Sequence, residues 1–322
     1  MFTKDELQDA HRLVRSYMPP TPQYAWPQLE ARLGCKVWVK HENHTPTGSF
    51  KVRGAFTFID WLKRTQPDCP GIVTATRGNH GQGQALAARA AGMRALVYVP
   101  HGNSVEKNAA MRAFGAELVE FGADFDEARE EVFRVAKAEG LHFVPPFHPE
   151  LVRGVATYAY ELLTARPQID TLYVPIGCGS GICGCIAARD ALGLSTKIVG
   201  VVSETAQTAK LSAEAGRLIE TAPPRTFADG MAVRVPVRAA LDIYGPGAER
   251  FVTVSDTQIA EAIRVYFSDT HNLAEGAGAA PLAALMQEAE AMKGREVALI
   301  LCGGNIDREW FLTVLRGDVP EV

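Results

Sequence analysis

A lysine stands directly after small polar residues at the start of a stretch with helical spacing. It ends the segment TGSFK, which runs from Thr47 to Lys51 and has Phe50 beside the lysine. A helix places partial positive charge at its N-terminus, so a cation is slightly disfavoured in this position. An amine held as a neutral imine would escape that penalty. Because surface lysines are common, the segment alone leaves a chemically active lysine and an ordinary one both open.

A glycine-rich turn is the second candidate. The segment GCGSGICG starts at Gly177 and joins an expected strand, residues 171–176, to a helical run. Closely spaced glycines let backbone N–H groups approach an anion, and the start of the next helix favours negative charge. A bound phosphate is therefore favoured over a turn that needs glycine only for positive φ. The spacing is not the G-x-G-x-x-G of nicotinamide sites, and no lysine ends the run as in a P-loop.

Two further segments follow expected strands. TRGNHGQG starts at Thr76 and offers hydroxyl, amide and backbone N–H groups, which suit a carboxylate and a phenol-like oxygen. Asn79 is equally a good helix N-cap, and His80 alone is more often a packing residue. CGGN starts at Cys302, at the carboxyl end of an apolar strand, where open parallel sheets bind ligands. A core cysteine is the ordinary alternative there.

Composition excludes several classes of protein. The 322 residues are 47% hydrophobic and 22% charged with a net charge of −4, which excludes a mainly disordered chain and disfavours nucleic-acid binding. No apolar run approaches the roughly 18 residues of a membrane span, and residues 1–10 lack a signal-peptide core, so we expect a cytoplasmic protein. The cluster Cys178, Cys183 and Cys185 lacks C-x₂-C spacing and a nearby histidine, so we expect no metal there.

Short apolar runs alternate with amphipathic stretches of crossover length, which predicts an α/β fold with parallel strands. The expected strands are residues 36–40, 71–75, 95–99, 117–120, 172–176, 198–202 and 297–301. The expected helices are residues 4–17, 79–91, 105–114, 125–138, 182–192 and 306–316. Residues 223–247 are rich in proline and glycine and are interpreted as a long excursion.

In their order and wording, the four segments resemble the fold type II, tryptophan-synthase-β-like pyridoxal-phosphate enzymes, and within them the serine and threonine dehydratase family. The resemblance extends along the chain to Thr21-Pro22, KHENHTPTGSFK (40–51), Ala228-Asp229-Gly230 and EGAG (275–278). It implies pyridoxal 5′-phosphate as cofactor, a homodimer and two domains. The large domain would comprise residues 1–66 and 148–322, and residues 67–147 would form a small inserted domain that carries the Asn79 loop.

The resemblance also implies roles for individual residues. Lys51 resembles the lysine that forms the Schiff base with the cofactor, and Phe50 the aromatic residue that packs on the cofactor ring. Asn79 matches the partner of the ring hydroxyl, and Cys302 the residue facing the pyridine nitrogen. The substrate carboxylate would lie against the loop formed by Thr76, Arg77, Gly78, Asn79 and His80. The phosphate would lie against Gly177, Cys178, Gly179, Ser180, Gly181 and Ile182.

The implied reaction is dehydration and deamination (β-elimination) of a β-hydroxy-α-amino acid of the threonine or serine type to a 2-oxo acid and ammonia. Arg77 departs from the family pattern, because racemases carry a serine there as acid/base and arginine is a poor proton shuttle. We therefore expect little racemase activity. Arg77 could instead favour a β-aryl substrate such as phenylserine, favour 3-hydroxyaspartate, or point to solvent.

Glu204 is the only carboxylate just after the strand 198–202, so the cation site of racemase-like members is doubtful here. β-Replacement stays an alternative reaction, and a non-catalytic nucleotide-binding protein is the alternative from another class. The 322 residues fit the catalytic unit alone, so feedback control through a regulatory extension is not expected.

Overall fold

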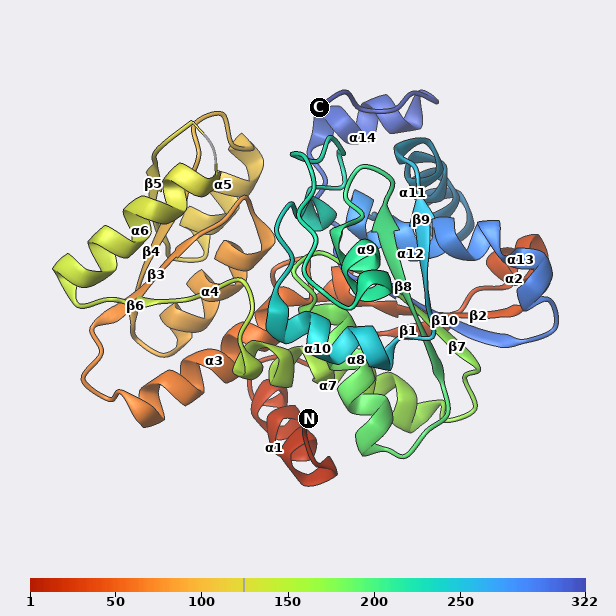
Figure 1. Cartoon of the computed structure of the whole chain (residues 1–322), viewed down its shortest axis with the longest axis horizontal. Helices are drawn as coiled ribbons and strands as arrows, with labels where there is room; N and C mark the ends of the chain where they lie inside the picture. Colours follow the sequence, from red (N-terminus) through yellow and green to blue (C-terminus); the bar gives the residue numbers. More distant parts are fainter. Residues whose placement is uncertain (124) are drawn as a thin grey trace.

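The computed structural model describes residues 1–123 and 125–322 and contains two sheets, which lie side by side in Figure 1. The larger is six-stranded in the order β1-β2-β10-β7-β8-β9, and the smaller is four-stranded in the order β5-β4-β3-β6. The strands of the larger sheet are β1 (Gln23–Ala25), β2 (Lys36–His41), β7 (Thr171–Pro175), β8 (Lys197–Ser203), β9 (Arg250–Val254) and β10 (Glu296–Leu301). Those of the smaller are β3 (Gly71–Ala75), β4 (Arg94–Val99), β5 (Glu117–Glu120) and β6 (His142–Phe143).

The strand pairings are parallel except for β1, which runs antiparallel to β2. The central strands β7, β8 and β10 are buried along nearly their whole length. This explains their continuous apolar runs, because strands covered by helices on both faces need no polar side. The expected α/β class is confirmed.

Helices surround the larger sheet. They are α1 (Lys4–Arg15), α2 (Pro27–Leu33), α7 (Pro149–Ala165), α8 (Ser180–Ala191), α9 (Thr208–Ala215), α10 (Arg238–Gly247), α11 (Asp256–Thr270), α12 (Gly276–Gln287), α13 (Ala289–Met292) and α14 (Arg308–Leu315). Both α8 and α12 pack against β7 and β8. Helix α12 is buried from Gly276 to Leu285, as its apolar composition requires.

Helices α4 (Asn79–Ala90), α5 (Val105–Ala113) and α6 (Phe125–Glu139) pack against the smaller sheet. Helix α3 (Lys51–Thr65) packs against both α4 and α7, so it joins the two regions. It has Lys51 as its first residue, as the sequence predicts. The division into domains at 66/67 and 147/148 stays a prediction.

The sequence missed several elements. Strand β9, the short strands β1 and β6, and the helices α2, α7, α9, α11 and α12 were not predicted. The proline- and glycine-rich excursion contains a 3₁₀ turn, Asp229–Met231, and helix α10, which has Pro246 in its last turn. Strands β1 and β6 are too short to show a pattern, and helix α12 is buried along Gly276–Leu285 and has no polar face. Helix α11 does have a local signal, the capping box formed by Ser255 and Gln258.

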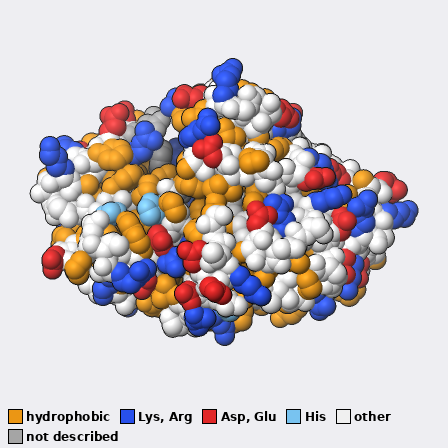
Figure 2. All heavy atoms as spheres, turned by 60° about the horizontal axis from the view of Figure 1, so that its bottom comes forward, with side chains coloured by type: hydrophobic (Ala, Val, Ile, Leu, Met, Phe, Trp, Pro, Cys, Tyr) orange, Lys and Arg blue, Asp and Glu red, His pale blue; other side chains and the backbone are white. Residues whose placement is uncertain are grey.

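Among the described residues, no helix is both long and apolar enough to cross a membrane. Figure 2 shows acidic and basic side chains mixed over one face of the molecule. That distribution agrees with the small net charge of −4 and offers no basic stripe on this face.

Candidate active site

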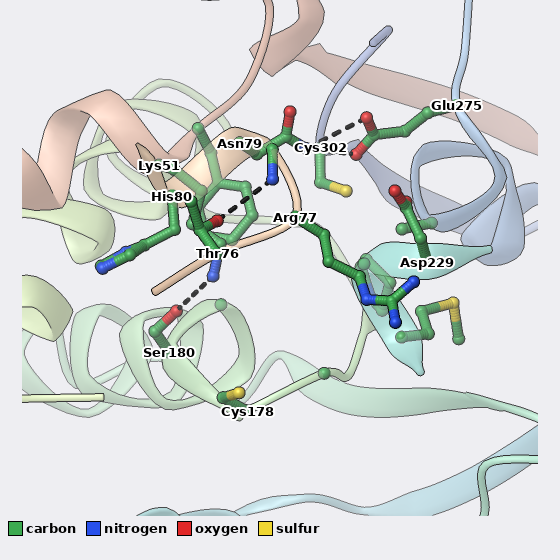
Figure 3. Close-up of a pocket in the computed structure, with 18 of the residues that line it drawn as sticks. Lys51, Thr76, Arg77, Asn79, His80, Cys178, Ser180, Asp229, Glu275 and Cys302 are labelled. Carbon is green, nitrogen blue, oxygen red and sulfur yellow. Dashed lines mark hydrogen bonds between the residues drawn. The ribbon is translucent and has the colours of Figure 1, made fainter. Parts of the chain in front are cut away.

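The four candidate segments meet at one cavity of about 140 Å³ (Figure 3). Every predicted site residue lines it except one. Ile182 is fully buried inside α8 and contributes to the core instead. The sequence assigned no role to the other lining residues, Pro175, Asp229, Gly230, Met231, Glu275 and Ala277.

Sheet register brings the lysine segment and the Cys302 segment together. Strands β2 and β10 pair in parallel with Leu301 opposite His41, so the chain leaves both strands at the same edge of the sheet. A bridge between Ser49 and Gly303 continues the pairing, and the Phe50 N–H donates to the Cys302 carbonyl at 3.0 Å. The two segments are therefore held by backbone hydrogen bonds.

The Lys51 amine lies inside the cavity. Its Nζ is 3.4 Å from Ser180 Oγ and 4.7 Å from the centre of the Phe50 ring. The Phe50 ring also packs edge-on against Tyr158, with ring centres 5.9 Å apart. The amine thus faces the start of α8, to which the glycine-rich turn leads.

The glycine-rich turn needs its glycines. A Cβ on Gly177 would lie 2.2 Å from the Gly230 carbonyl oxygen, so no side chain fits there. Gly179 has φ of +99° and precedes α8, which favours glycine. The backbone N–H groups at the N-terminus of α8 then face the cavity edge with partial positive charge, which suits a phosphate.

The Asn79 side chain does not cap its helix. Helix α4 starts at Asn79 and is preceded by Gly78, with no side-chain cap. The Asn79 amide instead donates to both oxygens of Glu275, at 2.9 and 3.0 Å, and accepts from Asn305 Nδ2 at 2.7 Å. The helix-cap interpretation is therefore wrong, and the Asn79 amide instead contacts Glu275 at the cavity.

Burial sets the protonation of the polar groups around the cavity. The pKa of Glu275 is raised to about 7, mainly by burial. The charge of the neighbouring Asp229 also raises this pKa, and the Lys107 ammonium lowers it by less. Burial also raises the pKa of Cys302 well above its usual range, so Cys302 is a neutral thiol at neutral pH. Burial and the Lys51 charge lower the pKa of His80 to about 3, so the imidazole is neutral.

Arg77 is the exposed cation of the site. Its side chain extends toward Asp229, away from Lys51 and Ser180 (Figure 3). Asp229 already forms an ion pair with Lys107 of α5. Within residues 1–123 and 125–322, no hydrogen bond or ion pair engages the Arg77 guanidinium. The cavity therefore has an unneutralised positive group at the end away from Ser180.

The Lys51 amine faces the glycine-rich turn and the N-terminus of α8, which can bind an anion, at the carboxyl ends of parallel strands. This arrangement is typical of an enzyme site for a cofactor that has a carbonyl and a phosphate group. Residues 14–303 match the family of pyridoxal-phosphate dependent enzymes, and the chain belongs to that family. It is 32% identical to an L-threonine ammonia-lyase of Thermotoga maritima, over 95% of this chain and 76% of that protein. It is 33% identical to an L-threo-3-hydroxyaspartate ammonia-lyase of a Pseudomonas species, over 97% and 98%.

The fold comparison agrees. The processed form of threonine deaminase isoform 2 from Solanum lycopersicum superposes with a TM-score of 0.90 at 28% identity, over 98% of this chain and 89% of that chain. The cofactor is pyridoxal 5′-phosphate, and the residues present fit it. Lys51 would supply an amine for its carbonyl, and the backbone N–H groups where the glycine-rich turn enters α8 would hold its phosphate.

Two functional candidates escaped the sequence analysis. Asp229 and Glu275 lie in segments that carry the resemblance, yet nothing in their local sequence shows that their carboxylates reach the cavity. The signal that could have indicated them is the glycine beside each, because Gly230 and Gly276 mark places where the backbone packs closely. Only the fold shows what approaches them.

Proposed function

We propose that the chain catalyses β-elimination from a β-hydroxy-α-amino acid, which releases a 2-oxo acid and ammonia. The observation that carries the proposal is the placement of the Lys51 amine 3.4 Å from Ser180 Oγ, at the start of α8. This puts a base and an anion-binding helix terminus on one small cavity. The names of the relatives, ammonia-lyases for threonine and for threo-3-hydroxyaspartate, support the same reaction class.

The cofactor, when bound through Lys51, supplies an electron sink that makes the substrate Cα–H acidic. Lys51, as a free amine, would be the base that takes the Cα proton. The N–H groups at the start of α8, with the Ser180 hydroxyl, hold the phosphate. Cys302, a neutral thiol, would face the ring nitrogen without adding a charge.

The substrate carboxylate is bound by the loop from Thr76 to His80. The Thr76 hydroxyl accepts from the Gly78 N–H at 3.1 Å, which shapes the loop, and α4 begins directly after it. The helix N-terminus favours an anion there. Since the His80 imidazole is neutral, the loop binds the carboxylate through hydrogen bonds and the helix dipole rather than through a histidine charge.

The test is Lys51→Ala, with Lys63→Ala as the matched control from the exposed side of the same helix. Lys51→Ala should abolish both the visible absorption of lysine-bound cofactor and the release of 2-oxo acid and ammonia. Lys63→Ala should retain both. Retention of both by Lys51→Ala excludes the proposal, and a wild-type protein without visible absorption favours the non-catalytic nucleotide-binding alternative.

β-Replacement is tested in the same assay. Ammonia release from threonine or serine without an added thiol supports elimination, whereas product that forms only with the thiol supports replacement. Loss of optical rotation without ammonia release would indicate racemase activity. Arg77 at the family's acid/base position argues against that activity, because arginine is effectively always protonated.

A specific observation favours 3-hydroxyaspartate as a second candidate substrate. The Arg77 guanidinium has no partner in the described part of the chain, and Asp229 is neutralised by Lys107. A carboxylate on the substrate Cβ would pair with this guanidinium. A phenyl group, as in phenylserine, could stack on it instead, with a smaller gain in free energy.

The family resemblance also supports a homodimer and a small domain formed by residues 67–147. Light scattering of the purified holoenzyme tests the first. Limited proteolysis tests the second, because cleavage would concentrate near residues 66 and 147 if these are domain boundaries.

A further inference from the structure

Glu275 is a carboxylate that the proposed reaction does not use, although it lies in the cavity. It directly precedes α12 and is 3% exposed. Its side chain accepts from Asn79 and from the Asn305 backbone N–H, at 3.2 Å. A Cβ on Gly303 would lie 2.6 Å from Glu275 Oε1, so the chain leaves room for this carboxylate at the expense of a side chain.

The distances fix how Asn79 uses its amide. Its nitrogen lies almost equally far from both oxygens of one carboxylate, at 2.9 and 3.0 Å, a geometry that one N–H directed between the oxygens satisfies. The amide oxygen is taken by Asn305 Nδ2, which also donates to the Thr47 carbonyl at 2.8 Å. An amide nitrogen has two hydrogens. Among the described residues, only Glu275 accepts from this nitrogen, so one N–H is left over, and Glu275 and Asn305 hold the two ends of the amide.

Several charged or titratable groups surround Glu275. Asp229 and its partner Lys107 lie on one side, Cys302 is close enough to be influenced by its charge, and Lys51 lines the same cavity. Among the described residues, no lysine or arginine pairs with Glu275 within 4 Å. Its charge is thus balanced by hydrogen bonds rather than by an ion pair, which makes ionisation sensitive to its surroundings.

We propose that Glu275 is a positioning residue of the cofactor site: it holds the Asn79 amide so that the second N–H stays available to the ring hydroxyl oxygen of the cofactor. This inference rests on the proposed function. An ionised Glu275 accepts from both Asn79 and Asn305, whereas a protonated one must find room for an added O–H among these donors. Protonation therefore loosens the hold on Asn79. Since burial brings the pKa of Glu275 to about 7, this occurs in the neutral range.

The experiment compares the wild-type holoenzyme with Glu275→Gln and Glu275→Asp. Glutamine replaces one acceptor by a donor that opposes the N–H of Asn79 or Asn305, and it does not titrate. We expect the visible absorption maximum of Glu275→Gln to shift and its pH dependence near neutrality to disappear. The turnover number should fall about 10-fold or more, because a misplaced positioning group is costly, with a smaller change in KM. Glu275→Asp should shift the maximum but keep a titration.

Asn305→Ala provides an independent variant if Glu275→Gln does not fold. It frees the amide oxygen of Asn79 and leaves the carboxylate, so the maximum should shift while the titration midpoint stays. Glu290→Gln, at an exposed carboxylate in α13, is the matched control and should behave as wild type.

A Glu275→Gln holoenzyme with the spectrum, pH profile and turnover number of the wild type overturns the inference alone. An Asn305→Ala spectrum unchanged from wild type also overturns it. A wild-type protein without lysine-bound cofactor overturns the proposed function, and this inference with it.

Discussion

Arg53 and Glu42 form a bidentate ion pair in the interior, and neither side chain has any exposed area. Arg53 Nε lies 2.7 Å from Glu42 Oε2, and its Nη2 lies 3.0 Å from Oε1. Glu161 of α7 holds the guanidinium at 2.8 and 2.9 Å, and Lys40 joins Glu161 at 2.7 Å. Since Arg53 is two residues after Lys51, this cluster fastens the first turn of α3 to β2 and α7.

We expect Glu42→Ala to lower the free energy of unfolding by about 3–5 kcal/mol, because it leaves a buried guanidinium short of one partner. Chemical denaturation of the cofactor-free protein measures this. Glu117→Ala is the matched control, since its pair with Arg94 is exposed and should change stability by about 1 kcal/mol or less. Equal effects of the two variants would contradict a structural role for the buried pair.

Acid should weaken the same cluster. Burial opposes ionisation of Glu161, but the hydrogen bond to His11 and the charges of Arg53 and Lys40 outweigh it and lower the pKa of Glu161. Because the folded-state pKa lies below the unfolded-state value, near 4.3, the stabilisation is present above that value and is lost as pH falls through the folded-state pKa. Urea denaturation of wild type and Glu161→Gln at several acidic pH values checks this. The variant should lose less stability on acidification, and parallel curves would refute the prediction.

Gly177→Ala should impair both folding and cofactor binding. Its Cβ would meet the Gly230 carbonyl oxygen at 2.2 Å, and relieving such a contact shifts the backbone at a cost of about 1–3 kcal/mol. Equilibrium titration with the cofactor, followed by absorbance, should show weaker binding. Gly245→Ala is the control, because its Cβ has an ordinary contact of 3.6 Å with Leu241. If Gly177→Ala bound the cofactor with wild-type affinity, the turn could shift without weakening cofactor binding, and the prediction would be wrong.

Arg77→Met should change substrate preference rather than abolish turnover. If the guanidinium binds a β-carboxylate, a charge-assisted hydrogen bond of about 1.5–3 kcal/mol is lost. This lowers kcat/KM for threo-3-hydroxyaspartate about 10-fold to 100-fold, with little change for threonine. The kcat/KM of Arg77→Lys for threo-3-hydroxyaspartate should lie between those of the wild type and Arg77→Met, because lysine keeps the positive charge but lacks the planar guanidinium.

Arg217→Met, at an exposed arginine outside the cavity, is the control for this series. A selective loss with phenylserine instead would indicate stacking on the guanidinium. A strong preference of the wild type for threonine, unchanged in Arg77→Met, would remove any specificity role for Arg77.

The sequence by itself determined the class of fold and the segments that carry the chemistry. Buried parallel strands have continuous apolar runs, and closely spaced glycines indicate a turn whose backbone can approach a ligand. Both signals are local, so the turn at Gly177 and the strand that ends before Cys302 could be predicted without a structure. The role of Lys51 was predicted from the family resemblance, because its own segment left an ordinary lysine open. The α/β class followed from the same alternation of elements.

The tertiary structure alone decided which side chains of those segments face the cavity. Ile182 belongs to the glycine-rich segment, but the first turn of α8 directs it into the core. Asn79 is a residue type that often caps helices, yet its amide donates to the carboxylate of Glu275, 196 positions later in the chain. Neither outcome has a local signal, because burial and the approach of a distant partner set the orientation and protonation of a polar group.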